Sequence, residues 1–369
     1  MSPEIPFGDL RREYQALGAM LDGAIKRVLE SGWFILGSET SAFEEEWARY
    51  LGAKHAIGVG NGTDAIRIAL EACGVRPGDE VVTTPLTAVP TVTAVCMLGA
   101  VPRFADVSPS TGLIDPSALS RVVSRGTRAI VPVHLYGNMC DMPAIMEIAR
   151  GIGAAVVEDC AQAHGATYGA AKAGTFGLAG CYSFYPSKNL GAYGDGGAVV
   201  CDNDEVASRC RMLRNYGQRA RYEHLAAGVN SRLDEIQAAI LRAKLPYLDQ
   251  WNARRTAIAR CYDAAISGDS VRPLARSDGG VCHLYVLACR DRAGLQAHLA
   301  ARGIATQVHY PRPVHLQPAF AWLGLSPGSY PVAEELADSV LSLPMHPFLR
   351  EDEVTQVAEA LAEYCQRNR

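Results

Sequence analysis

The chain has 369 residues, of which 49% are hydrophobic and 20% charged, and its formal net charge is −4. This apolar content excludes a disordered chain, and the length predicts two domains at roughly 100–200 residues each. The mildly acidic, mixed-sign composition gives no reason to expect a nucleic-acid partner, and no apolar stretch reaches the ~20 residues of a membrane span. An N-terminus without a signal-peptide pattern, and eleven cysteines without a CxxC pair, predict a cytoplasmic protein with reduced thiols and no metal site.

Short apolar segments alternate with helical patterns through the first half of the chain. We expect helices over 8–30, 41–51, 64–73, 90–98 and 142–152, and strands over 55–60, 80–84, 128–133 and 154–158. Strands that alternate with helices of this length are typical of βαβ units. The sequence therefore predicts an α/β fold with a mostly parallel sheet.

The pattern changes after residue 177. We expect short strands over 180–185, 191–197 and 198–202, and then a long helix over 231–261 that Pro246 interrupts. The segment 266–280 is rich in Gly, Ser and Asp and is typical of a linker. Beyond it we expect a strand (281–289), a helix (292–302), a strand (304–309) and a terminal helix from 350. These elements predict a large α/β domain over 1–250 and a smaller C-terminal α+β domain over 251–369.

A glycine-rich turn ends the first predicted strand. It reads Gly58-Val-Gly60-Asn-Gly62-Thr63-Asp64 and opens a helix. Glycines let the backbone approach an anion, and a helix N-terminus offers free N–H groups, so this turn is a candidate phosphate site. An ordinary capped turn remains the alternative. The glycine spacing is not that of a GxGxxG dinucleotide fingerprint.

Two further positions suggest the chemistry. Asp159 lies at the carboxyl end of a predicted strand, where open α/β sheets bind ligands, although a turn or helix cap is the plain alternative. Lys188 lies at a strand-to-loop junction among small hydroxyl residues and glycines, whereas the other four lysines (26, 54, 172 and 244) fall on helix faces, at a helix end or in a polar loop. Elimination therefore favours Lys188 as a Schiff-base lysine.

These three parts together fit pyridoxal phosphate. That cofactor needs a lysine for its Schiff base, a carboxylate beside its pyridinium nitrogen and donors for its phosphate. A nicotinamide-linked oxidoreductase is a competing interpretation, but it explains only the glycine turn.

The sequence resembles the DegT-type nucleotide-sugar aminotransferases, a family within the aspartate-aminotransferase-like type I fold of pyridoxal-phosphate enzymes. The resemblance covers nearly the whole chain, and an ordered series of motifs carries it. These are Ile35-Leu-Gly37, Gly60-Asn-Gly-Thr-Asp-Ala65, Pro132-Val-His-Leu-Tyr-Gly137, Glu158-Asp-Cys-Ala-Gln-Ala-His164, Ser183-Phe-Tyr-Pro-Ser-Lys-Asn-Leu190, Gly194-Asp-Gly-Gly197, Asn230-Ser-Arg-Leu-Asp-Glu235, His309-Tyr-Pro-Arg-Pro-Val-His-Leu-Gln-Pro318 and Leu343-Pro-Met-His-Pro347.

The resemblance implies a role for each matching residue. Lys188 is the Schiff-base lysine and proton shuttle, Asp159 the partner of the ring nitrogen, and Gln162 the contact of the ring hydroxyl. Asn230 reaches the phosphate of the neighbouring subunit, so the resemblance implies a homodimer with shared active sites. The residues implied to hold the phosphate are Gly62, Thr63, Asp64 and Ser183, and those implied to lie near the nucleotide-sugar are His309, Tyr310 and His315.

The implied reaction moves an amino group, with glutamate as the expected donor, to a keto carbon of a nucleotide-diphosphate 6-deoxyhexose. The Asn230–Glu235 motif favours the third ring carbon over the fourth, and Lys188 argues against a dehydrating branch that carries histidine there. A 4-keto sugar aminotransferase and a pyridoxal-phosphate-binding regulator without turnover remain alternatives. One departure is Ala88, which stands where the family usually has an aromatic residue that stacks on the cofactor ring.

Overall fold

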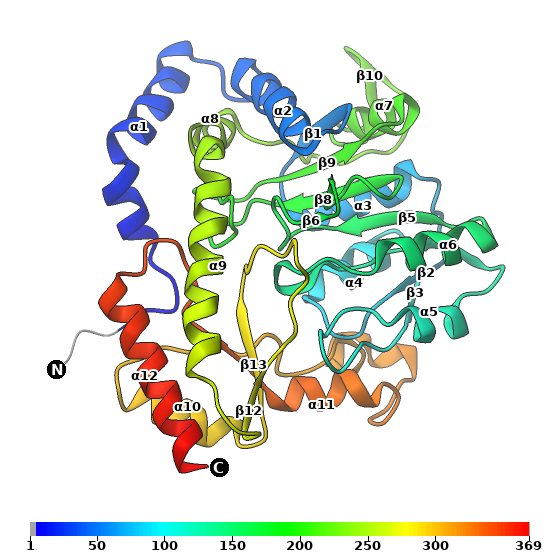
Figure 1. Cartoon of the computed structure of the whole chain (residues 1–369). Coiled ribbons are helices and arrows are strands. Elements are labelled where there is room, and N and C mark those ends of the chain that lie inside the picture. Colours follow the sequence, from blue (N-terminus) through cyan, green and yellow to red (C-terminus); the bar gives the residue numbers. More distant parts are fainter. Residues whose placement is uncertain (1–4, 369) are drawn as a thin grey trace.

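The computed structural model describes residues 5–368, and its centre is a seven-stranded sheet (Figure 1). The strand order is β1-β9-β8-β5-β4-β2-β3, and β9 alone runs antiparallel to its neighbours in this sheet. The predicted α/β fold with a mostly parallel sheet is confirmed. The strands are β1 (His55–Val59), β2 (Glu80–Thr83), β3 (Val101–Phe104), β4 (Thr127–Ile130), β5 (Ala155–Asp159), β8 (Ala179–Ser183) and β9 (Gly197–Cys201).

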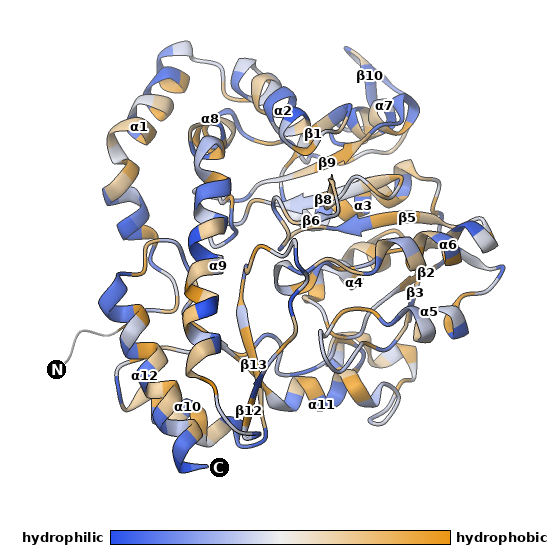
Figure 2. Ribbon diagram, in the orientation of Figure 1, coloured by the Kyte–Doolittle hydropathy of each residue, from blue (hydrophilic) through white to orange (hydrophobic). Residues whose placement is uncertain are grey.

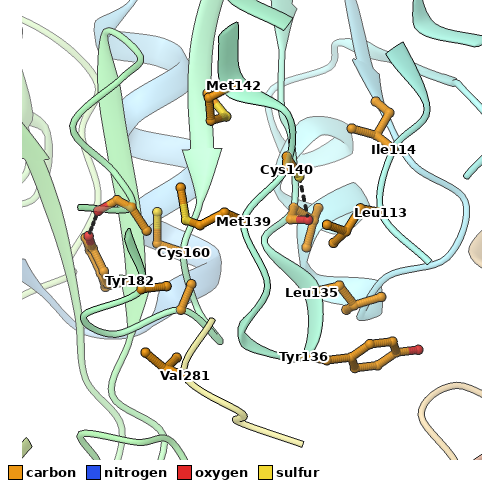
Figure 3. Close-up of a cluster of buried hydrophobic side chains, with 14 of the residues drawn as sticks. Leu113, Ile114, Leu135, Tyr136, Met139, Cys140, Met142, Cys160, Tyr182 and Val281 are labelled. Atoms are coloured by element: carbon orange, nitrogen blue, oxygen red, sulfur yellow. Dashed lines mark hydrogen bonds between the residues drawn. The ribbon is translucent and has the colours of Figure 1, made fainter. Parts of the chain in front are cut away.

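Helices cover both faces of this sheet, as a parallel sheet requires. One face packs on α3 (Gly62–Ala72), α4 (Val89–Met97) and α7 (Asp204–Leu213), and the other on α2 (Ser38–Leu51), α5 (Pro116–Val122), α6 (Met142–Ile152) and α8 (Glu235–Lys244). Neighbouring residues of one strand point to opposite faces, so Val156 and Val157 belong to different apolar clusters. Figure 3 shows part of the apolar cluster on the face that α2, α5, α6 and α8 cover, around Met139, Cys140 and Tyr182. In Figure 2 the hydrophobic stripes of the helices follow this packing.

The predicted long helix is interrupted at Pro246, as expected. It consists of α8, a 3-10 turn (Leu245–Tyr247) and α9 (Leu248–Ala265), because proline removes a backbone donor and cannot continue the regular helix. The N-terminal helix α1 (Leu10–Ser31) lies outside the main layers and packs Ala24 and Val28 against α8.

A second, antiparallel sheet lies below the first in Figure 1. It contains β12 (Val271–Pro273), β13 (Tyr285–Cys289) and β14 (Val340–Leu343), and α9, α10 (Arg292–Ala300) and α12 (Glu351–Arg367) cover it. By contrast α11 (Pro331–Ser339) packs its buried side chains into the apolar cluster of the large sheet. The division into domains at residue 250 stays a prediction.

Three expectations were wrong. Residues 191–196 form no strand; Gly191 instead packs closely on the Pro186 carbonyl oxygen, with which a Cβ at this position would collide. Residues 304–309 make only isolated bridges, from Ile304 to Ile5 and from Gln307 to Ser342. The expected linker over 266–280 contains β12, which pairs with β13.

Several short elements carried too weak a pattern to be predicted. They include β3, α5, α7, α11, β14, the hairpins β6 (Thr167–Tyr168) with β7 (Ala171–Lys172) and β10 (Gln218–Ala220) with β11 (Glu223–His224), and the 3-10 turns Leu135–Gly137, Val314–Leu316 and Pro318–Leu323. Over residues 5–368, every helix is too short or too polar to cross a membrane.

Candidate active site

Several of the predicted cofactor-binding residues lie at one edge of the large sheet. Strands β1, β8 and β5 run in the same direction, so their carboxyl ends lie together. The glycine turn follows β1, Asp159 ends β5 and Ser183 ends β8. This is the edge at which α/β sheets bind ligands.

The glycine turn forms an anion site at the N-terminus of α3. The Asn61 side chain caps the helix by accepting a hydrogen bond from Asp64 N at 2.8 Å, so the Asp64 N–H is already used. The N–H groups of Gly62 and Thr63 have no partner within the helix. A Cβ on Gly62 would lie 2.6 Å from the Ser183 Cβ, so only glycine lets these free donors come this close to the Ser183 hydroxyl. A phosphate fits this cradle.

Asp159 is a buried carboxylate held by two hydrogen bonds. Its Oδ2 accepts from the Thr91 hydroxyl at 2.8 Å and its Oδ1 from Ala161 N at 3.1 Å, while Thr91 also meets the Thr87 hydroxyl at 3.0 Å. Burial raises the pKa of Asp159, and the hydrogen bonds from Thr91 and Ala161 act against that shift. A buried carboxylate needs a cation or a protonated ring as a partner, which a pyridinium supplies.

Lys188 is poised to lose its proton. Burial lowers the pKa of its ammonium to about 8, and the charge of Asp159 acts in the opposite direction. No ion pair of Lys188 is present within residues 5–368. A lysine with a lowered pKa has more free amine at neutral pH, as a Schiff-base nucleophile requires.

Gln162 links the sheet edge to the segment that contains His309 and Tyr310. Its Oε1 accepts a hydrogen bond from Tyr136 N at 2.6 Å, and its Nε2 donates to the Tyr310 hydroxyl at 3.2 Å. The Tyr136 hydroxyl donates to His309 O at 2.5 Å. A cavity of about 550 Å³ opens at this point, and its walls include Gln162, Lys188, His309 and Tyr310.

Two predicted residues lie elsewhere. His315 is buried between Phe104 and Tyr330, where its Nε2 meets Glu334 Oε1 at 3.0 Å, and it is not among the residues that line the cavity. The side chain of Asn230 is exposed to solvent, next to Ser231, whose hydroxyl accepts from Gly60 N at 3.0 Å.

Sequence reasoning missed residues that position the others. Thr91 and Tyr136 orient Asp159 and Gln162, and both lie in segments that the sequence had drawn attention to for other reasons. Two further residues of the cavity wall, Arg255 and His346, were also missed. Arg255 has no local pattern that distinguishes it from an ordinary helix residue, whereas His346 lies in the Leu343–Pro347 motif, to which no role was assigned.

The geometry defines a class of protein. A lysine of lowered pKa, a buried carboxylate and a free helix N-terminus near one sheet edge fit pyridoxal phosphate, and the chain has the fold of a type I pyridoxal-phosphate-dependent transferase. The family model of the DegT/DnrJ/EryC1/StrS aminotransferase family matches residues 16–362, and the chain belongs to this family. Its aminotransferases use pyridoxal phosphate, which confirms the predicted cofactor.

Similar proteins cover the chain from end to end. A "pleiotropic regulatory protein" of Geobacillus stearothermophilus is 46% identical over 98% of this chain and 98% of its own. A dTDP-3-amino-3,4,6-trideoxy-alpha-D-glucose transaminase of Streptomyces venezuelae is 45% identical over 99% of this chain and 97% of its own. The solved structure of S. venezuelae DesV in complex with a ketimine intermediate has a TM-score of 0.97 and 44% identity, and the match covers 99% of this chain and 100% of that one.

Proposed function

We propose that the protein is a nucleotide-sugar aminotransferase that moves an amino group from glutamate to the 3-keto carbon of a nucleotide-linked 6-deoxyhexose. The observation that carries this proposal is Lys188, a lysine of lowered pKa in the wall of a cavity of about 550 Å³, close enough to the buried carboxylate of Asp159 for that charge to act on it. The name of the Streptomyces venezuelae relative supports the third ring carbon and a dTDP-linked substrate. Amino transfer at the fourth carbon is the alternative that the test must separate.

In this proposal each residue has one task. Pyridoxal phosphate supplies an electron sink when it is bound. Lys188 holds the cofactor and moves the proton, Asp159 keeps the ring nitrogen protonated, and Gln162 contacts the ring hydroxyl. Gly62, Thr63 and Ser183 form the phosphate cradle, whereas the expected contribution of the Asp64 N–H is ruled out because Asn61 already binds it. His309 and Tyr310 face the substrate. His315, with Glu334 as its partner, supports the fold of the segment that presents them.

We also propose that the active unit is a homodimer with shared sites. Several apolar side chains of α1 and of the residues after it are exposed, which favours a partner surface there: Leu10, Tyr14, Leu29, Trp33, Phe34 and Ile35. The exposed amide of Asn230, free of any hydrogen bond among residues 5–368, fits a contact with the phosphate of the partner. Ala88 leaves one side of the cofactor ring uncovered by an aromatic residue of this loop, so the cover must come from another segment.

Two half-reactions test the function. Glutamate should convert the cofactor of the purified protein from its aldehyde to its amine form, which absorbance records. A dTDP-linked 3-keto-6-deoxyhexose should then restore the aldehyde form and yield a sugar labelled at the third carbon when [15N]glutamate is the donor. Conversion of the 4-keto isomer alone would move the reaction to the fourth carbon.

A second candidate is a regulator that binds the cofactor without turnover, which the name of the Geobacillus stearothermophilus relative favours. A protein that stays in the aldehyde form with glutamate and with other amino donors would support this regulator and contradict the aminotransferase.

A further inference from the structure

The cavity beside Lys188 contains a buried cation without an anionic partner. Arg255 of α9 is 5% exposed, and its Nη1 donates to two carbonyl oxygens, His283 O at 3.2 Å and Met345 O at 2.6 Å. Its Nε has no hydrogen-bond partner, and no carboxylate pairs with the guanidinium among residues 5–368. Burial lowers the pKa of Arg255 to about 10, although the charge of Glu13 in the same cavity wall acts in the opposite direction, so the side chain is still charged at neutral pH. Such a charge is costly to bury unless an anion binds beside it.

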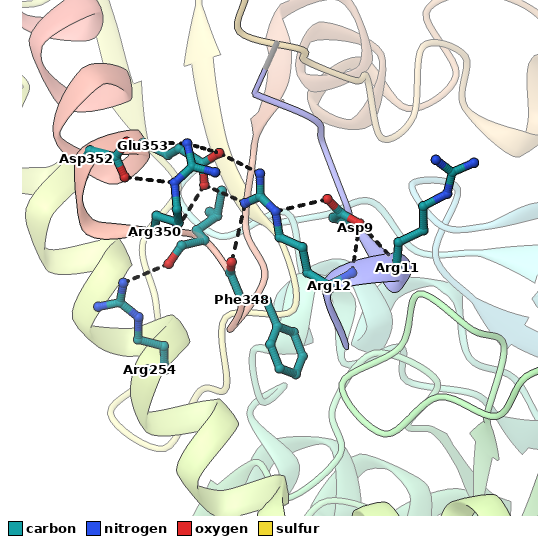
Figure 4. Close-up of polar contacts among 9 residues, drawn as sticks. Asp9, Arg11, Arg12, Arg254, Phe348, Arg350, Asp352 and Glu353 are labelled. Carbon is teal, nitrogen blue, oxygen red and sulfur yellow. Dashed lines mark hydrogen bonds and ion pairs between the residues drawn. The ribbon is translucent and has the colours of Figure 1, made fainter. Parts of the chain in front are cut away.

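The carboxylates in the wall of this cavity already have cationic partners. Asp9 pairs with Arg12 at 3.1 Å, and Glu13 pairs with Lys244 of α8. Figure 4 shows that Arg12 also binds Glu353 of α12, so its charge is fully used. Arg255 therefore forms no ion pair among residues 5–368, and its guanidinium can bind an anion that enters the cavity.

His346 supplies a second group without a partner. It is 7% exposed, lines the same cavity, and neither of its ring nitrogens has a hydrogen-bond partner. It follows Met345, whose carbonyl oxygen Arg255 binds, so the backbone holds the two side chains near each other. Burial lowers the pKa of His346 to about 4, and the neutral ring offers one N–H donor and one acceptor.

A short chain of hydrogen bonds fixes Arg255 relative to the reacting lysine. Asn189, the residue after Lys188, meets His283 Nδ1 through its Oδ1 at 2.9 Å, and the carbonyl oxygen of His283 accepts from Arg255. The guanidinium thus has a set position in the cavity that Lys188 lines.

We propose that Arg255, with the ring N–H of His346, binds the α-carboxylate of the amino donor. The proposal rests on the proposed aminotransferase function. The α-carboxylate is attached to the carbon that carries the transferred amine, so it must lie next to Lys188. The diphosphate of a nucleotide-sugar is separated from the keto carbon by ring atoms and lies farther away. Guanidinium groups bind carboxylates through paired N–H groups, which a lysine cannot reproduce.

The test measures the two half-reactions separately in the holoenzyme. Arg255→Met should raise the KM for glutamate by about 10- to 100-fold, as the loss of a charge-assisted hydrogen bond predicts. Arg255→Lys keeps the positive charge and should raise this KM by less. The half-reaction with the aminosugar product should change by less than about threefold. Glutarate, a dicarboxylate that cannot react, should inhibit the wild type competitively and the Met variant far more weakly.

The neighbouring arginine provides the matched control. Arg254, labelled in Figure 4, binds Leu349 O at 3.0 Å and Glu351 at 2.7 Å. It is not among the residues that line the cavity, so Arg254→Met should leave both half-reactions unchanged. Because Arg255 also anchors two carbonyl groups, His346→Phe tests the same site without loss of those anchors, and it should raise the glutamate KM as well.

Different results separate the possible errors. Wild-type protein that fails to react with glutamate would contradict the proposed function itself. Wild-type activity together with an unchanged glutamate KM in Arg255→Met and His346→Phe would contradict the assignment of Arg255. A loss confined to the sugar half-reaction would place the diphosphate at Arg255 and overturn the carboxylate assignment.

Discussion

Replacement of Asp159 by Asn separates the charge of this side chain from its shape. In the wild type Oδ1 accepts from Ala161 N and Oδ2 accepts from the Thr91 hydroxyl. The amide keeps one oxygen for Ala161, and its NH₂ can donate to Thr91, because a hydroxyl both donates and accepts. Both contacts survive, so we expect the free energy of unfolding to change by less than about 1.5 kcal/mol.

The loss of charge has a much larger effect on the reaction. A carboxylate beside a titrating nitrogen raises the pKa of that nitrogen by about 1–3 units, and each unit is about 1.4 kcal/mol. The Asn variant should lose this stabilisation of the protonated ring nitrogen. The expected cost of roughly 1.4–4 kcal/mol slows the half-reaction with glutamate by about 10- to 1,000-fold.

Stopped-flow absorbance of the cofactor measures this rate, and urea unfolding measures the stability. Thr91→Val is the matched control, because it removes the hydroxyl at 2.8 Å but leaves the carboxylate charge. We expect a smaller loss of rate in this variant than in Asp159→Asn. If the Asn variant reacts within threefold of the wild type, Asp159 serves only as a structural cap and the argument from charge is wrong.

Three other predictions concern the lysine, a buried glutamate and the dimer. Lys188→Ala should abolish turnover without loss of the fold, and borohydride reduction of the wild type should place the pyridoxyl label on Lys188, as mass mapping of peptides can check. Glu235 accepts from the backbone N–H groups of Gly37, Glu39 and Thr40 at 2.8, 2.9 and 2.9 Å, so Glu235→Ala should lower the free energy of unfolding by about 3–5 kcal/mol. Burial raises the pKa of Glu235 and these hydrogen bonds lower it, and the net effect is a decrease. The contribution of Glu235 to the free energy of unfolding is therefore present above the unfolded pKa of about 4.3, and it should disappear as the pH falls through the folded pKa. Coexpression of a Lys188→Ala chain with an Asn230→Asp chain should restore part of the activity if the sites are shared, because one site of the mixed dimer is then intact. No recovery of activity would place Asn230 in the site of its own chain.

The sequence by itself predicted the large sheet and the main candidate residues of the site. The alternation of apolar strands and helices predicted parallel strands, and parallel strands bring their carboxyl ends to one edge. Gly62 and Asp159 each follow or end such a strand, so their place at one edge followed from the local pattern, whereas Ser183 was implied only by the family resemblance. Lys188 was identified because the chain has only five lysines.

Only the tertiary structure decided which other groups reach the cavity. Arg254 and Arg255 are neighbours on one helix, yet the first points to α12 and the second lines the cavity. His315 and His346 both lie in proline-rich segments, yet Glu334 binds the first, and the second stays without a partner beside Arg255. The strand expected over 304–309 failed for the same reason, since its partners are Ile5 and Ser342. Contacts between segments far apart in the chain fix these outcomes, and a local pattern of residues contains no information on which distant segment will pack against it.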